Sequence, residues 1–332
     1  MSDKIRAAIT ATGHYVPEYR LTNAELESYV DTNDEWIRSR TGIVERRILK
    51  DPDKATAYMA TETAKTVLKN RGIDGSEIDA IIIATVTPDY FFPATACLVQ
   101  REIGATKAFG FDVSAACSGF VYAISTGAGM IESGRYKKVL VIGADKMSSI
   151  VDYTDRATCI IFGDGAGGVL LEASDSGNGI HDFIQRCDGQ EAELLCQPGG
   201  GSLNPPTHET IDKRMHYIRQ EGRVVFKKAT EAMADVSLEI MERNNLTNED
   251  IDWLVPHQAN ERIITATGRR MGLSSDKVMI NIDKYGNTTA ATIPLCLSEW
   301  NEAGRLNEGD DIILASFGGG FTWGSVYLKW GK

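Results

Sequence analysis

The stretch from Leu68 to Ala84, LKNRGIDGSEIDAIIIA, ends a helical pattern, turns and then enters an apolar run opened by Ile-Asp. A second stretch from Met241 to His257, MERNNLTNEDIDWLVPH, contains the same features in the same order. Similarity of a chain to itself over a long spacing indicates a duplicated structural unit. The sequence therefore predicts two related halves.

Two more pairs of segments resemble each other and occur in the same order in both parts of the chain. GRYKKVLVIGAD from Gly134 resembles GRLNEGDDIILASF from Gly304, and IIFGDGAGGVLLE resembles ASFGGGFTWGSVYLK further along. Apolar runs without alternation, such as AIIIAT and VLVIGA, are typical of strands buried on both faces of an α/β sheet. We therefore expect an α/β fold whose halves, residues 1–175 and 176–332, are related by a pseudo-two-fold axis and divided at the polar connector EASDSGNG.

The pattern of strands and helices breaks down between residues 183 and 222. This segment includes CQPGGGSLNPPTHETIDKRMHYIRQEG, which is too long and irregular for a simple connection. Long excursions of this kind in a compact domain are usually functional or disordered. Because it carries scattered aromatic residues and Met215, we expect it to form a cap over a site.

The composition argues against several functional classes. A formal net charge of -11 disfavours binding to nucleic acid, because most of the surface would repel a phosphate backbone. No apolar run is long enough to span a membrane and the N-terminal residues lack the features of a secretory signal, so we expect a cytoplasmic protein without a membrane partner. The cysteines show no paired spacing and the histidines no ligand spacing, so we expect reduced thiols and neither a metal ion nor another cofactor.

A cysteine lies where a strand-like run gives way to a helical pattern, in VSAACSGF (113–120). Cys117 is open to two interpretations: a small residue that fills the core, or a thiolate whose pKa is lowered at the positive end of a helix. When Gly134 is aligned with Gly304, Cys117 falls on Asn287 of YGNTTAATIP. We therefore expect Cys117 and Asn287 to begin equivalent helices that point toward a shared centre, which favours the nucleophile.

His257, in IDWLVPHQANERI, follows a predicted strand and precedes a predicted helix, at the edge where open α/β sheets collect ligands. A lone histidine is more often a structural residue than a catalyst, although its near-neutral pKa suits both roles. Together with Cys117 and Asn287 at comparable edges, His257 completes a nucleophilic constellation known from unrelated folds. The sequence therefore predicts one site for these three side chains.

Two glycine-rich segments are candidates for ligand binding. GDGAGG, from Gly163 to Gly168, matches the dinucleotide pattern, but the strand-like VLLEAS follows it where a helix is required, so we reject a dinucleotide site. FGGGFTWG, from Phe317 to Gly324, is either a tight hairpin or one wall of an oxyanion hole, because the backbone N–H groups of glycines can approach a ligand closely.

Six segments together resemble the β-ketoacyl-[acyl carrier protein] synthase III family, the initiating condensing enzymes of dissociated fatty-acid synthesis. They are DTNDEWIRSRTGI, VSAACSGF, FGDGAGG, VPHQANERI, YGNTTAAT and FGGGFTWGS, and the likeness runs from Ile9 to Trp330. The resemblance implies a thiolase-like fold with a layered αβαβα core and a homodimer. It also implies an acyltransferase that condenses an acyl-CoA primer with malonyl-acyl carrier protein, giving 3-oxoacyl-acyl carrier protein, CoA and CO2.

The resemblance assigns roles to the residues of the central site. Cys117 corresponds to the nucleophile that carries the acyl group as a thioester. His257 and Asn287 correspond to the donors that stabilise the enolate formed when CO2 leaves. The N–H groups of Cys117 and Gly319 correspond to the oxyanion hole for the acyl carbonyl. Two residues correspond to parts of the acyl pocket: Phe162, which lies near it, and Phe92, which closes the pocket of the other subunit.

The resemblance also implies a site for the adenine of CoA, in which aromatic and cationic groups stack on the purine. The corresponding residues are Trp36, Arg40 and Arg156. From the residues themselves, DEWIRSR is expected to be a helix that begins with a capping box formed by Thr32 and Glu35.

Arg262, Arg269 and Arg270 follow His257 in ANERIITATGRRMG. On a helix Arg262 and Arg269 share a face because they are seven residues apart, and Arg270 lies beside them. Basic residues on a helix commonly form a solvated face, but in an acidic protein this strip suits a strongly acidic acyl carrier protein. We expect Arg262 and Arg269 to form the carrier-protein docking site.

Other families with this fold fit the sequence less well. Thiolases use a second cysteine in the C-terminal glycine loop, and FGGGFTWG has none, since Cys296 lies in the preceding predicted helix. A starter condensing enzyme of polyketide or quinolone synthesis is the closest alternative. A non-catalytic acyl-binding protein is a further alternative, which the presence of Cys117, His257 and Asn287 disfavours.

Overall fold

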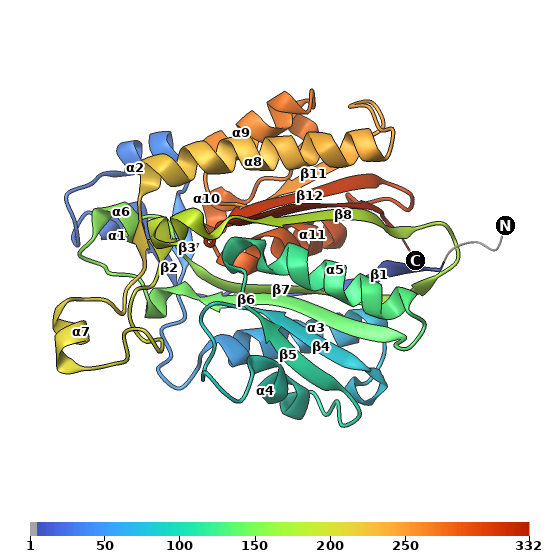
Figure 1. Cartoon of the computed structure of the whole chain (residues 1–332), viewed down its shortest axis with the longest axis horizontal. Coiled ribbons are helices and arrows are strands. Elements are labelled where there is room, and N and C mark those ends of the chain that lie inside the picture. Colours follow the sequence, from blue (N-terminus) through green and yellow to red (C-terminus); the bar gives the residue numbers. More distant parts are fainter. Residues whose placement is uncertain (1–4, 332) are drawn as a thin grey trace.

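The computed structural model describes residues 5–331, in which layers of helices and sheets alternate (Figure 1). Two β-sheets enclose a pair of central helices, and further helices cover the outer face of each sheet. This is an αβαβα arrangement, so the expected fold class is confirmed.

The first sheet has the strand order β1-β7-β6-β4-β5. The strands are β1 (Arg6–Tyr15), β4 (Ala80–Ala84), β5 (Phe109–Val113), β6 (Lys138–Lys146) and β7 (Asp164–Ser174). β4 runs parallel to β5 and β6, whereas β7 is antiparallel to β1 and β6. Every residue of β4, AIIIA, is buried, because helices cover both faces of this sheet. The outer face packs against α3 (Thr56–Arg71) and α4 (Thr95–Glu102).

The second sheet has the strand order β11-β12-β13-β8. The strands are β8 (Gly179–Cys187), β11 (Trp253–Pro256), β12 (Asp311–Gly318) and β13 (Thr322–Lys329). Its outer face is covered by α8 (Gly222–Arg243) and α9 (Glu261–Arg270). The first sheet thus uses residues 6–174 and the second uses residues 179–329. The division of the chain into 1–175 and 176–332 is compatible with this arrangement and stays a prediction.

The central layer consists of α5 (Gly119–Glu132) and α11 (Thr292–Glu302). Both helices are apolar around most of their circumference, as expected of helices with a sheet on either side. The start of α5 lies close to the turn η6 (Thr289–Ala291), since a Cβ on Gly119 would be 3.4 Å from the Cβ of Ala290. The two helix starts predicted from the repeat therefore meet in the middle of the molecule.

The remaining elements are short and lie mainly around one end of the layers. They are β2 (Arg20–Thr22), α1 (Asn23–Leu26), α2 (Asp34–Thr41), β3 (Glu45–Arg47), α6 (Arg156–Cys159), β9 (Leu195–Cys196), α7 (His208–Asp212), β10 (Arg219–Gln220) and α10 (Ile282–Tyr285). Short 3₁₀ turns include η2 (Ala116–Ser118) before α5.

Two sequence-based expectations about local structure are wrong. The irregular excursion begins after Cys187 and not at residue 183, because β8 continues its antiparallel pairing with β13 as far as Cys187 opposite Thr322. The expected capping box at α2 is also absent from the described residues. Asn33 caps this helix, since its side-chain oxygen accepts the backbone N–H of Trp36 at 2.8 Å.

Candidate active site

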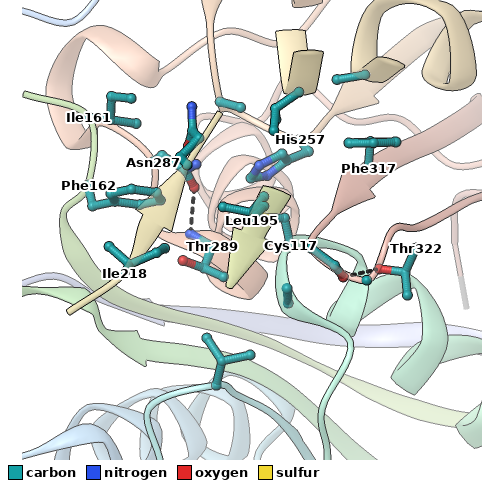
Figure 2. Close-up of a pocket in the computed structure, with 18 of the residues that line it drawn as sticks. Cys117, Ile161, Phe162, Leu195, Ile218, His257, Asn287, Thr289, Phe317 and Thr322 are labelled. Atoms are coloured by element: carbon teal, nitrogen blue, oxygen red, sulfur yellow. Dashed lines mark hydrogen bonds between the residues drawn. The ribbon is translucent and has the colours of Figure 1, made fainter. Parts of the chain in front are cut away.

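One cavity of about 430 Å³ is lined by residues of both halves, among them Cys117, His257 and Asn287. Figure 2 shows these three side chains around a common space, with Phe317 beside His257. Gly319 also lines the cavity. The structure therefore brings together residues that the sequence predicts for one site, although they lie far apart along the chain.

The backbone of Cys117 is held by contacts from the other half. The residue lies in η2, after a sharp bend at Ala116, which has a positive φ of 46°. The Ser316 hydroxyl donates to the Cys117 carbonyl oxygen at 2.7 Å. Gly318 lets β12 approach closely, because a Cβ there would lie 2.6 Å from the Cys117 nitrogen. The nucleophile candidate thus has a fixed position between α5 and β12.

The Cys117 thiol is neutral in the free protein. Burial raises its pKa to about 12 and the nearby Asp145 carboxyl acts in the same direction, whereas a hydrogen bond from Asn287 acts against both. The interpretation of Cys117 as a thiolate with a lowered pKa is therefore wrong for the resting state. The pKa is raised because the loss of hydration on burial outweighs the favourable field at the start of a helix.

Alkylation of Cys117 by iodoacetamide is expected to accelerate about tenfold per pH unit from pH 7 to pH 9, without a plateau. A raised pKa leaves the thiol protonated throughout this range, so the reactive thiolate fraction grows in proportion to hydroxide. Peptide mass spectrometry measures the rate at this cysteine, and the exposed Cys97 and Cys187 serve as internal references. A plateau below pH 8 would show a stabilised thiolate instead.

His257 follows β11 directly, and its backbone N–H donates to the Ala315 carbonyl at 2.8 Å. Nδ1 of the ring lies 2.7 Å from Oγ1 of Thr292, and both side chains are buried. Nε2 is buried too and has no hydrogen-bond partner within residues 5–331. Burial lowers the His257 pKa to about 3, so the imidazole is neutral at physiological pH. A neutral ring with one unpartnered nitrogen at the cavity is suited to meet a ligand oxygen.

The Asn287 side chain is oriented by its own turn. Its Oδ1 accepts the backbone N–H of Thr289 at 2.8 Å, as Figure 2 shows, which leaves the amide N–H groups for the cavity. Its backbone N–H donates to the Ile161 carbonyl at 2.9 Å, and its carbonyl accepts from Gly163 at 3.0 Å. The loop before β7 thus holds Asn287 in place from the other half of the chain.

The glycine segment after β12 is a hairpin that also reaches the cavity. β12 ends at Gly318 and β13 begins at Thr322, so the hairpin interpretation is confirmed. Gly319 leaves no room for a side chain, because a Cβ there would lie 2.8 Å from the Leu195 carbonyl oxygen. The strand predicted after GDGAGG is also confirmed, since β7 begins at Asp164. The oxyanion role of Gly319 stays a prediction.

Comparison with known proteins decides the family. A sequence profile described as 3-oxoacyl-[acyl-carrier-protein (ACP)] synthase III matches residues 111–189, and its C-terminal counterpart matches residues 241–330. The β-ketoacyl-[acyl-carrier-protein] synthase III of Chlorobaculum tepidum is 61% identical over 98% of this chain and 100% of its own length. The chain belongs to the β-ketoacyl-[acyl-carrier-protein] synthase III family.

Solved structures agree with this family membership. The 3-oxoacyl-[acyl-carrier-protein] synthase III of Aquifex aeolicus is 44% identical, with a TM-score of 0.91 over 98% of this chain and 100% of that one. The priming β-ketosynthase of the R1128 polyketide pathway has the same TM-score of 0.91 but is 30% identical, over 99% of this chain and 98% of that one. Both structures therefore share the fold of this chain, but the Aquifex aeolicus enzyme is more similar to it in sequence.

Part of the cavity wall is apolar. It comprises Val86, Met147, Ile150, Ile161, Phe162, Leu195 and Ile218. Leu195 and Ile218 come from the irregular segment after β8, so this segment contributes to the cavity wall, and its role as a cap stays a prediction. The sequence analysis does not single out either residue, because neither belongs to a motif. The one feature that could have indicated them is their apolar character within the irregular segment. Phe92 is 86% exposed and does not line the cavity of its own chain.

The residues expected to bind CoA lie outside the cavity lining, on α2 and α6. The Arg156 guanidinium lies over the Trp36 ring, 5.1 Å from its centroid, and donates to the Asp31 carbonyl at 2.9 Å. Asn260, which lines the cavity, donates to the Arg40 carbonyl at 2.8 Å and so joins α2 to the cavity wall. The side chains of Trp36 and Arg156 are thus in contact, whereas the exposed Arg40 is linked to the cavity wall through its backbone carbonyl.

The arginines of α9 are not equivalent. Arg262 and Arg269 border one shallow hollow on the surface, which agrees with the expected shared face. The Arg262 guanidinium also lies over the Phe226 ring, 4.9 Å from its centroid. Arg270 forms an ion pair with Asp235 at 2.7 Å, so its charge is compensated. Arg262 and Arg269 are therefore the better candidates for an acidic partner.

Three further findings bear on the chemistry of the protein. Among residues 5–331, no three histidine, cysteine or acidic side chains gather in a way that would hold a metal ion. In the same part of the chain, no helix is both long and apolar enough to cross a membrane. All six cysteines are free thiols.

Proposed function

We propose that this protein is an initiating condensing enzyme of fatty-acid synthesis, which joins a short acyl-CoA to malonyl-acyl carrier protein. The observation that carries the proposal is that the buried side chains of Cys117, His257 and Asn287 line one cavity in a chain of this family. A thiol is needed to hold the acyl group, and neutral hydrogen-bond donors are needed where an enolate develops. The products are 3-oxoacyl-acyl carrier protein, CoA and CO2.

In the first half-reaction, the Cys117 sulfur attacks the thioester carbonyl of acyl-CoA. The S–H bond of Cys117 breaks as the new C–S bond forms, and the proton ends on the departing CoA sulfur. Because burial keeps the thiol protonated in the free protein, the thiolate is generated during the reaction. We assign the N–H groups of Cys117 and Gly319 to the carbonyl oxygen, which becomes negative in the tetrahedral intermediate.

In the second half-reaction, the malonyl thioester loses CO2 and the electron pair of the broken C–C bond forms an enolate. We assign the Asn287 amide and Nε2 of His257 as donors to the enolate oxygen. The low pKa of His257 keeps the imidazole neutral, and a neutral imidazole can still stabilise an enolate by donating a hydrogen bond from its one protonated nitrogen. The enolate carbon then attacks the thioester on Cys117, whose sulfur leaves and takes up a proton.

Two surfaces near the cavity fit the two substrates. We assign the Trp36 ring and the Arg156 guanidinium to the adenine of CoA, which would enter between them. We assign Arg262 and Arg269 to the acyl carrier protein, because neither is paired with a carboxylate within residues 5–331. Asn260 connects the two surfaces, since it begins α9 and bonds to α2.

A homodimer completes this proposal. β5 is an edge strand of the first sheet, and edge strands carry N–H and C=O groups that can pair with another chain. Phe109 on β5 is 44% exposed, and the aromatic run Tyr90-Phe91-Phe92 is exposed in the loop that leads to α4, which packs on β5. A second copy on this surface would allow Phe92 to close the acyl pocket of its neighbour.

The free cysteines support a cytoplasmic location.

Reversing the charge of Arg262 and Arg269 to glutamate together is expected to raise the KM for malonyl-acyl carrier protein by about tenfold or more. Like charges would then face the acidic carrier protein, and the effect is expected to be larger at low salt because screening is weaker. Acyl transfer from acyl-CoA is expected to be unchanged. Steady-state kinetics at two ionic strengths measure the first effect, and intact mass measures the second.

Two variants serve as controls for this experiment. Reversing Lys65 and Lys69 on α3 changes the net charge equally on a distant helix and is expected to leave both KM values unchanged. Trp36→Ala is expected to weaken acyl-CoA alone by about 1 to 3 kcal/mol of lost stacking, because malonyl-acyl carrier protein has no adenine. Equal loss of both half-reactions in the arginine variant would contradict the docking proposal.

The wild-type protein tests the function itself. Acetyl-CoA is expected to leave an acetyl group on Cys117, and later addition of malonyl-acyl carrier protein is expected to remove it as 3-oxobutyryl-acyl carrier protein. The fatty-acid role is favoured over a polyketide starter role, since the Chlorobaculum tepidum synthase III is 61% identical to this chain and the R1128 polyketide priming enzyme is 30% identical. Absence of an adduct on Cys117 would favour a non-catalytic acyl-binding protein.

A further inference from the structure

The proposed role of His257 requires its ring proton on one particular nitrogen. A neutral imidazole donates from one nitrogen and accepts at the other, and the partner of the inner nitrogen decides which is which. Donation from Nε2 of a neutral ring to an enolate oxygen therefore requires that Nδ1 carry no proton, and a donor to Nδ1 favours that state. The group within reach of Nδ1 is the Thr292 hydroxyl, at 2.7 Å.

The Thr292 hydroxyl has one proton and two acceptors within hydrogen-bond distance. One is Nδ1 of His257, and the other is the Thr289 carbonyl oxygen at 3.1 Å. That carbonyl already accepts the backbone N–H of Thr292, so it is satisfied without the hydroxyl. The contact with Nδ1 is also the shorter of the two. The Thr292 hydroxyl therefore donates more favourably to Nδ1 of His257 than to the Thr289 carbonyl.

We infer that Thr292 donates its hydroxyl proton to Nδ1 and thereby holds His257 in the tautomer that carries its proton on Nε2. This inference rests on the proposed function, in which the proton on Nε2 is donated to the enolate oxygen. Nε2 is buried without a hydrogen-bond partner within residues 5–331, and a buried donor of this kind is unfavourable until an acceptor binds. Thr292 is a positioning residue, because it acts on the substrate through His257.

The same turn orients both proposed donors. Thr289 presents its backbone N–H to Oδ1 of Asn287, and three residues later Thr292 presents its hydroxyl to His257. Thr292 is the first residue of α11 and is buried, so its side chain has little freedom to turn away. Residues 287–292 therefore supply one donor and set the tautomer of the other.

The tautomer is tested directly on the free protein. Histidine labelled with ¹⁵N gives separate NMR signals for protonated and bare ring nitrogens, and His257→Gln identifies the signals of this residue. We expect the wild type to show a protonated Nε2 and a bare, hydrogen-bonded Nδ1. Finding the proton on Nδ1 would overturn the inference. This measurement needs no activity, so it holds even if the proposed reaction fails.

Two substitutions then test the consequence for the reaction. Thr292→Val removes the hydroxyl at nearly constant volume, and we expect decarboxylation of malonyl-acyl carrier protein to fall by about tenfold to a hundredfold, by analogy with groups that orient metal-bound histidines. Acyl transfer to Cys117 is expected to persist. Thr292→Ser keeps the hydroxyl and is expected to restore most of the decarboxylation. If the valine variant does not fold, the wild-type tautomer and the serine variant decide.

A matched control is Thr267→Val on the buried side of α9. It also removes a buried hydroxyl, which donates to the Ile263 carbonyl at 3.0 Å, and is expected to change neither half-reaction. A wild-type rate of decarboxylation in Thr292→Val would contradict the inference. Equal loss of both half-reactions that serine does not restore would also contradict it, because that result marks a structural role. If the wild type neither takes up an acyl group nor releases CO2, the proposed function fails instead.

Discussion

Replacing Cys117 with alanine is expected to abolish acyl transfer and condensation while decarboxylation of the malonyl thioester continues. The sulfur is the only atom of the proposed site that bonds to the acyl group, whereas the proposed enolate donors belong to His257 and Asn287. Intact mass after mixing with acetyl-CoA measures acyl transfer. Release of radiolabelled CO2 from malonyl-acyl carrier protein measures decarboxylation in the same preparation.

Cys296→Ala is a suitable control for this experiment. Cys296 is a fully buried thiol on α11 and does not line the cavity, so its loss is expected to leave the acyl adduct intact. An adduct that survives Cys117→Ala would place the acyl group on another residue. Loss of decarboxylation together with acyl transfer would show that the sulfur also takes part in the second half-reaction.

Replacing either His257 or Asn287 with alanine is expected to have the opposite effect. Decarboxylation is expected to fall by about a hundredfold to a thousandfold for each lost donor, the scale for removal of one oxyanion contact. Acyl transfer to Cys117 is expected to persist, because the pKa of His257 near 3 and that of Cys117 near 12 disfavour a resting proton transfer between them. The same two assays measure both half-reactions.

The competing mechanism makes His257 an obligatory base for Cys117. It is supported if His257→Ala cannot be acylated but still decarboxylates, and our division of labour is then wrong. His181→Ala provides the control, because His181 lies on β8, bonds to the Gly177 carbonyl and does not line the cavity. This variant is expected to behave as the wild type in both assays.

The sequence by itself determined the repeat, the α/β class of its two parts, and the three residues Cys117, His257 and Asn287 as members of one site. These features have local or repeated signatures: an apolar run predicts a buried strand, and a polar residue between strand and helix lies at a sheet edge. The family resemblance then assigned roles to Trp36 and Arg156, whose side chains are in contact, and these roles stay predictions.

Only the tertiary structure decided the chemical state of the site. The pKa of the Cys117 thiol rises because packing removes its hydration, and no neighbour in the sequence reveals how completely. The partner of His257 lies 35 residues away at Thr292, and the segment that supplies Leu195 and Ile218 has no motif. Burial, tautomer and cavity shape depend on contacts between distant segments, so they become defined only when the two halves pack together.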